Sequence, residues 1–238
     1  MAEKGLYDRD IREPLFDFLE ETYGKVRILE EKRMGRSRAD LVLVLPEALV
    51  GIEIKSDADS YARLKRQVAD YNRYFDTNFV VAGTRHAMHI EEHVPDWWGI
   101  ITAELEAGVV DFYMLRAPGE NPAKDRKKKL GFLWRPELVH LQELNGMPRY
   151  REKSKEFVAN KILERVPGEL LDRQISEELF ERDYQLIGET IRNYREEQRR
   201  GAEEAGAEKE PDMEGVGKED EGAGSRKGTG YGRRGKRR

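Results

Sequence analysis

The chain has 238 residues, enough for one large domain or two small ones. Its 43 Lys and Arg residues and 47 Asp and Glu residues give a formal net charge of −4, which excludes a uniformly basic DNA coat but not a local basic patch. Cysteine is absent, which excludes disulfide scaffolds, zinc fingers, iron–sulfur clusters and thiol catalysis. No apolar run approaches the ~20 residues needed to span a bilayer, and the amino terminus has no apolar signal core, so we expect a cytoplasmic protein without a membrane partner.

The first 116 residues combine helix and strand patterns. Apolar residues at helical spacing predict a helix over 7–23, with Asp8 or Asp10 as N-cap and Pro14 in the first turn of its regular part. A second amphipathic helix is predicted at 60–76. Alternating or continuous apolar runs predict strands at 26–33, 39–45, 50–55, 79–83, 98–104 and 109–115. This order predicts an α/β fold with a mixed β-sheet core flanked by helices in residues 1–116.

The remaining chain divides by composition. Residues 117–129 contain two prolines, a glycine and a run of basic residues, and we interpret them as a basic linker or loop. Helical patterns with short breaks predict a small helical appendage at 130–194. Residues 195–238 carry hardly any large apolar side chain, so they cannot bury enough surface to offset the entropy of ordering, and we expect a disordered, charged tail.

Two of the predicted strands form a hairpin that carries charged residues on one side. If its turn is centred between Glu47 and Ala48, Asp40 faces Lys55, and Glu53 emerges on the same side because side chains alternate along a strand. Two carboxylates at this distance repel each other unless they are neutralised, and a hard divalent cation with oxygen ligands is a natural solution. The alternative is a solvated surface pair between Glu53 and Lys55.

These residues resemble the PD-(D/E)xK nuclease superfamily. The resemblance rests on Asp40, the strand Gly51-Ile-Glu-Ile-Lys55 and the following helix with Gln67-Val-Ala-Asp-Tyr71, which is similar to the Gln-x-x-x-Tyr motif of the RecB and lambda-exonuclease branch. Leu133-Trp-Arg-Pro-Glu-Leu is also similar to small, largely uncharacterised bacterial and phage members. Ala39 stands where the name-giving proline would be, which is frequent in this superfamily.

The resemblance implies a restriction-endonuclease-like core and a Mg²⁺ or Mn²⁺ ion held by Asp40, Glu53 and the backbone carbonyl of Ile54. Lys55 would serve the attacking water, and Gln67 and Tyr71 would position metal-bound water or substrate. Many members add a carboxylate from the first helix, for which the first candidate is Glu13 and the second Glu20.

Basic residues near the motif are candidate DNA contacts. In the core these residues are Arg36, Arg38, Arg63 and Arg66. In the appendage, a helix at 136–145, a basic loop and a helix at 153–166 are similar to a SAP-type DNA-binding hairpin. Its contacts would be Arg149, Arg151, Lys153 and Lys155. The alternative is a helical subdomain that only packs on the core.

We therefore expect a Mg²⁺- or Mn²⁺-dependent deoxyribonuclease that acts in DNA repair, recombination, or mobile-element processing or defence. One alternative is a catalytically inactive nuclease-fold module that binds DNA or recruits a partner, and another is a purely structural interaction protein. The sequence leaves open endonuclease or exonuclease action, DNA or RNA as substrate, and a homodimer with two sites for two strands.

Overall fold

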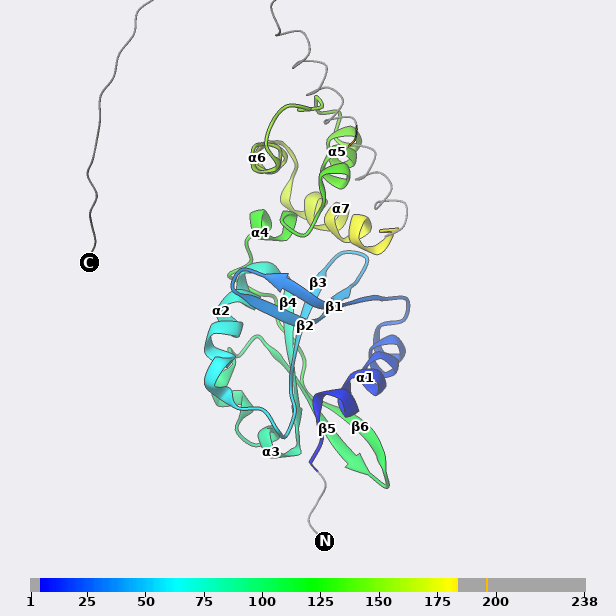
Figure 1. Ribbon diagram of the computed structural model, residues 1–238, viewed down its shortest axis with the longest axis vertical. Helices are drawn as coiled ribbons and strands as arrows, with labels where there is room; N and C mark the ends of the chain where they lie inside the picture. Colours follow the sequence, from blue (N-terminus) through cyan, green and yellow to red (C-terminus); the bar gives the residue numbers. More distant parts are fainter. Residues whose placement is uncertain (1–4, 184–195, 197–238) are drawn as a thin grey trace, which may run out of the picture. The chain divides into compact units, whose positions relative to one another are not determined.

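One sheet organises the amino-terminal part of the protein. In the computed structural model, which describes residues 5–183 and residue 196, six strands lie side by side in chain order (Figure 1). The pairs β3–β4 and β4–β5 are parallel, and the other three pairs are antiparallel. The strands are β1 (Arg27–Met34), β2 (Ser37–Val44), β3 (Leu49–Lys55), β4 (Thr77–Gly83), β5 (Gly99–Glu106) and β6 (Val109–Arg116). This mixed sheet with flanking helices confirms the predicted fold class.

Different helices cover the two faces of the sheet (Figure 1). α1 (Asp8–Tyr23) buries Leu15 and its apolar neighbours against one face. α2 (Leu64–Tyr74) buries Tyr71 against the other. Strand side chains alternate between the faces, so the central strands contribute to both apolar cores. The shorter elements that follow in this part are η1 (Tyr61–Arg63), α3 (Thr84–Ala87) and η2 (Ile90–His93).

The first helix differs from the prediction. α1 begins at Asp8, so Pro14 lies inside the helix and not in its first turn. Tyr7 is the N-cap residue, and its backbone N–H donates to Asp10 Oδ2 at 3.0 Å, so neither aspartate is the cap. The apolar face around Leu15 is fully buried. Packing of that face stabilises the helix enough to tolerate the one hydrogen bond that proline cannot make.

The β2–β3 hairpin also differs from the prediction. Leu41 pairs with Ile52, so the turn is centred at Pro46-Glu47, one position earlier than predicted. As a result Lys55 does not lie opposite Asp40. Proline has a fixed φ that suits the first central position of a tight turn, and this explains the observed centre.

The helical appendage packs on the same face of the sheet as α2. It consists of α4 (Arg126–Leu130), α5 (Arg135–Leu144), α6 (Lys155–Arg165) and α7 (Gly168–Phe180). Apolar residues of these helices share one buried cluster with Val44 and Phe75 of the core. The segment predicted as a basic linker, 117–129, runs into α4 and is not a loop over its whole length.

Lys129 from that segment is fully buried. Its ammonium is 2.7 Å from Asp76, which follows α2, and 2.8 Å from Asp172 on α7. Asp76 also accepts a hydrogen bond from the N–H of Leu49 at the start of β3. The buried lysine therefore connects the sheet to the appendage.

The predicted disordered tail, 195–238, and the last appendage residues, 184–194, lie outside the described residues, apart from residue 196. Within the described ranges, no helix is both long enough and apolar enough to cross a membrane.

Candidate active site

Glu53 and Lys55 are buried at the end of β3. This strand is buried over its whole length, and the two residues are only 1% and 5% exposed. The Lys55 ammonium donates to Glu53 Oε1 at 2.5 Å. The pair is therefore not the solvated surface pair that the sequence left open. Burying two charged groups beside each other costs free energy, so the pair by itself is weak evidence for a stabilising role.

The strands β2 and β3 separate next to this pair. Their ladder ends at Leu41 and Ile52, one residue before Asp40. Past this last pair, Ile54 N donates to the side-chain oxygen Asp40 Oδ2 at 2.8 Å and not to a backbone carbonyl of β2. Continuing the register by one residue sets Asp40 across from Glu53. The two carboxylates therefore come from neighbouring strands.

The Tyr71 hydroxyl lies between the separating strands. It accepts a hydrogen bond from Asp40 N at 3.2 Å and donates to the carbonyl of Ile52 at 2.9 Å. Gly51 provides the space for this close approach of α2. A Cβ at Gly51 would lie 2.6 Å from the Tyr71 ring and 2.2 Å from the ring of Phe75. Sequence reasoning did not use this glycine, although it stands within the motif strand.

Gln67 lies one helical turn before Tyr71 and reaches the same pair of charges. Its Nε2 donates to Glu53 Oε1, and its Oε1 accepts from Lys55 Nζ at 3.3 Å. The structure thus brings together the five predicted residues, which are Asp40, Glu53, Lys55, Gln67 and Tyr71.

Burial raises the pKa values of both carboxyl groups. Burial, followed by the negative charge of Glu53, raises the pKa of Asp40 to about 7, against the smaller opposing effects of the Ile54 N–H and Lys55. Burial also raises the pKa of Glu53, and the ammonium of Lys55 opposes that shift. A nearby cation would favour the charged form of both groups.

The donor atoms fit a hard divalent cation. Glu53 Oε1 is engaged by Lys55 and Gln67, whereas Glu53 Oε2 is buried without a hydrogen-bond partner in the described part of the chain. Within residues 5–183 and 196, no group of three or more His, Asp or Glu side chains could hold a metal. An ion here would therefore use two carboxylates, the predicted carbonyl of Ile54 and water, a ligand set typical of Mg²⁺.

Arg12, which sequence reasoning missed, connects α1 to the site. Its Nη1 donates to the backbone carbonyl of Asp40 at 3.2 Å, and its Nη2 lies 3.3 Å from Glu31. Glu31 lies opposite Asp40 with φ +53°, a conformation that interrupts the β1–β2 pairing at this point. Glu13, the candidate carboxylate from α1, is exposed, as is Glu20. The i, i+4 spacing of Asp8 and Arg12 was the available sequence signal.

The predicted DNA-binding residues of the core and the appendage are exposed. Arg38 forms an ion pair with Glu31, and the Lys153 ammonium lies 5.8 Å from the centre of the Phe157 ring. Lys155 donates to the carbonyl of Gly131 at 3.1 Å. Arg149 forms an ion pair with Glu143. The candidates that form no ion pair with another described residue are all exposed, and they are Arg36, Arg63, Arg66, Arg151, Lys153 and Lys155.

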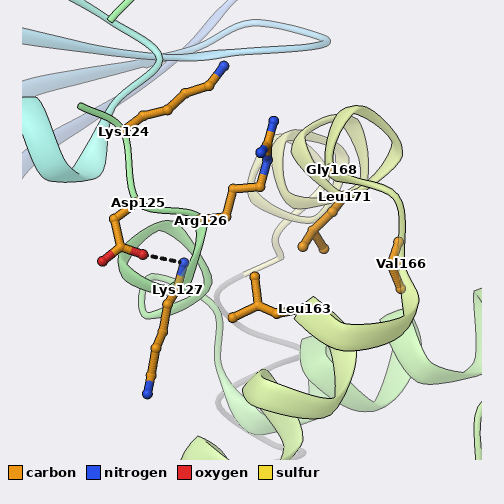
Figure 2. Close-up of a pocket in the computed structure, with 8 residues that line it drawn as sticks. All are labelled: Lys124, Asp125, Arg126, Lys127, Leu163, Val166, Gly168 and Leu171. Atoms are coloured by element: carbon orange, nitrogen blue, oxygen red, sulfur yellow. Dashed lines mark hydrogen bonds between the residues drawn. The ribbon is translucent and has the colours of Figure 1, made fainter. Parts of the chain in front are cut away.

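A separate pocket of about 440 Å³ lies between α4, α6 and α7 (Figure 2). It contains none of the predicted site residues. Its basic side chains already have acidic partners, since Arg126 pairs with Asp172 and Lys127 with Glu156. The pocket therefore has little unpaired positive charge to attract an anion.

Residues 1–199 match the family model of bacteriophage P4 protein cII, and the chain belongs to this family. A comparison with curated proteins finds no match. Among solved structures, Pyrococcus furiosus SfsA in complex with Ca²⁺ matches with 15% identity and a TM-score of 0.28. The match covers 44% of this chain and 59% of that protein. Similarity at this level indicates neither fold nor function.

Proposed function

We propose that this member of the bacteriophage P4 protein cII family is a nuclease that hydrolyses DNA phosphodiester bonds with Mg²⁺ or Mn²⁺. Its setting would be DNA repair, recombination, or the processing of or defence against mobile DNA. One observation carries the proposal: Asp40, Glu53 and Lys55 lie together, largely buried, where β2 and β3 separate. The resemblance to the PD-(D/E)xK superfamily supports the same reaction.

Asp40, Glu53 and the Ile54 carbonyl would hold the ion. When bound, the ion would act as a Lewis acid that polarises the phosphodiester and lowers the pKa of a water bound to it. The raised pKa of Asp40 suits a site in which an incoming cation replaces a proton. The unpartnered Oε2 of Glu53 offers a second oxygen without breaking the contact to Lys55.

Lys55 would assist the attack. An ammonium has three donors, and two of them are occupied by Glu53 and Gln67. The third N–H is available for the attacking water or for a phosphate oxygen, where it stabilises developing negative charge. Gln67 and Tyr71 act as positioning residues, because they hold the carboxylate, the ammonium and the two strand edges in place.

The test is a cleavage assay on linear duplex, circular single-stranded and branched DNA and on RNA, each with Mg²⁺ or Mn²⁺. We expect metal-dependent cutting of DNA by the wild type. We expect Glu53→Ala and Lys55→Ala to lose at least 100-fold in rate, because removing a charge stabiliser at a reacting phosphate has a large effect.

Lys65→Ala, which removes an exposed lysine of α2, is the matched control and should retain full activity. A Lys55→Ala protein that cuts at the wild-type rate would exclude the assigned role of Lys55. Salt-sensitive DNA binding with no cutting of any substrate would support the alternative, a nuclease-fold module that binds DNA or recruits a partner.

A further inference from the structure

Three basic side chains from separate parts of the fold converge on the turn between α4 and α5. The Lys32 ammonium of β1 lies 5.7 Å from the centre of the Phe132 ring. Lys155, the first residue of α6, donates to the carbonyl of Gly131 at 3.1 Å. Arg182, beyond α7, donates to the carbonyl of Phe132 at 2.9 Å. We call Lys32, Lys155 and Arg182 the cationic cluster.

The acidic groups near this cluster are already engaged. Glu137 is buried, and its two carboxylate oxygens accept from Arg182 at 2.6 and 2.7 Å. Glu178, farther out, is hydrogen-bonded to His140. Neither Lys32 nor Lys155 forms an ion pair with any residue that the structure describes, in contrast to the paired cations of the pocket in Figure 2.

This arrangement leaves two lysines that form no ion pair in the described part of the chain, with the buried Glu137 as the negative charge near them. Burial lowers the pKa of Lys32, the charges of Arg182 and Lys155 lower it further, and the charge of Glu137 opposes them. Burial also lowers the pKa of Lys155, the negative charge of Glu137 opposes this shift, and Arg182 adds a smaller lowering effect. An anion between them would relieve both effects, since an opposite charge favours the protonated ammonium.

The cluster also lies beside the candidate active site. Lys32 pairs across β1 and β2 with Ala39, the residue directly before Asp40. Lys155 extends the positive charge from this edge of the sheet to the helical appendage. A polyanion bound at Asp40 and Glu53 that continues past β1 would meet the two lysines.

We propose that Lys32 and Lys155 together bind a phosphate of the nucleic-acid backbone, away from the phosphate that is cleaved. This inference rests on the proposed function and extends it, because it gives the appendage a role in holding the substrate. The lysines contact a charged backbone and not base edges, so the contact contributes affinity without sequence preference.

The test measures binding of a labelled duplex by fluorescence anisotropy in EDTA, over a series of KCl concentrations. Each phosphate contact contributes about 0.9 to the slope of log affinity against log salt for duplex DNA. We expect the double variant Lys32→Gln/Lys155→Gln to bind at least 10-fold more weakly, with a slope smaller by about 1.

The matched control, Lys25→Gln/Lys161→Gln, removes the same charge from the chain just before β1 and from α6. It should leave the slope nearly unchanged. The conservative Lys32→Arg should retain binding, and the single Lys155→Gln variant serves if the double variant does not fold. An unchanged affinity and slope in the Lys32→Gln/Lys155→Gln protein would overturn the proposal.

Inorganic phosphate provides a second arm. If only the wild type binds inorganic phosphate while wild type and double variant bind the duplex equally well, the site takes free phosphate and the backbone proposal is wrong. Cleavage is a separate readout. If DNA binding depends on both lysines but no DNA is cleaved, the proposed nuclease activity is wrong and the proposed phosphate contact is supported. If DNA is cleaved but the salt slope of the double variant is unchanged, the nuclease activity is supported and the phosphate contact is wrong.

Discussion

At the scale of single residues, the site depends on charges placed where water is scarce. Asp40 and Glu53 lie close together, and each accepts from a donor of β3: Ile54 N donates to Asp40, and Lys55 donates to Glu53. Such a cluster is unfavourable for stability unless a cation or a proton neutralises it. The two largely buried carboxylates that lower the stability of the fold are therefore the same groups that would bind the metal ion.

The raised pKa of Asp40 predicts that the free energy of unfolding depends on pH. The folded-state pKa of this carboxyl group is about 7, against an ordinary value of 3.8, so folding favours the protonated form. The stabilisation is fully present below about pH 4 and is lost as the pH rises through 7. We expect the free energy of unfolding of the wild type to fall between pH 4 and pH 8, measured with urea in EDTA. In Asp40→Asn this fall should be smaller by about 2–4 kcal/mol.

The Asp40→Asn substitution keeps a side-chain oxygen for the Ile54 N–H, so the comparison isolates the charge. At low pH, wild type and Asp40→Asn should have similar free energies of unfolding. If the two curves stay parallel up to pH 8, the carboxyl group is not held in this raised state. Adding Mn²⁺ should stabilise the wild type at high pH and not the variant.

At the scale of elements, the approach of α2 to β3 decides the geometry of the site. The Gly51 position has no room for a side chain, and the Tyr71 hydroxyl reaches Ile52 only because α2 lies this close. The hairpin between β2 and β3 also contributes to this geometry. Its two-residue turn lies at Pro46-Glu47, one position before the predicted centre, and this turn sets which residues of the two strands face each other.

Gly51→Ala tests this packing. The added methyl group would overlap the rings of Tyr71 and Phe75, so α2 must move outwards. We expect a loss of about 1–3 kcal/mol in the free energy of unfolding, measured with urea, because overpacking a rigid core is costly. Cleavage should fall as well, since Gln67 and Tyr71 move with the helix.

Ala82→Gly is a control on the neighbouring strand, where a methyl group is removed from the same face. It should cost stability without displacing α2, and so should leave cleavage near the wild-type rate. A Gly51→Ala protein with unchanged stability and activity would contradict the close approach.

At the scale of the whole molecule, a buried ion network joins the sheet to the appendage. Lys129 has no exposed surface and contacts both Asp76 and Asp172. We expect Lys129→Met to lose about 3–5 kcal/mol of stability, because it leaves two buried carboxylates with fewer partners. Thermal unfolding monitored by circular dichroism measures the change.

Lys127→Met is the matched control from the same short helix. Its partner Glu156 is exposed, and surface pairs contribute little. The control should therefore unfold close to the wild-type temperature. Equal effects of the two substitutions would show that burial of Lys129 is not what stabilises the contact between core and appendage.

Periodicity by itself determined much of the fold. Alternation in the strands and the apolar faces of the helices at 7–23 and 60–76 predicted the mixed sheet and its two covered faces, because these patterns reflect local geometry. Strand alternation also predicted that Asp40, Glu53 and Lys55 share one face of the hairpin, whereas Gln67 and Tyr71 were assigned to the site by the resemblance to the PD-(D/E)xK superfamily.

Only the tertiary structure decided what each charge contacts. Lys129 stands in a basic run that is typical of a solvated loop, yet two aspartates distant in sequence make it a buried ion. Arg12, and not the expected Glu13, reaches Asp40, because burial of the apolar face of α1 around Leu15 turns Glu13 towards solvent. Composition and period describe a residue and its near neighbours, whereas the free energy of a charge depends on all the groups that folding brings around it.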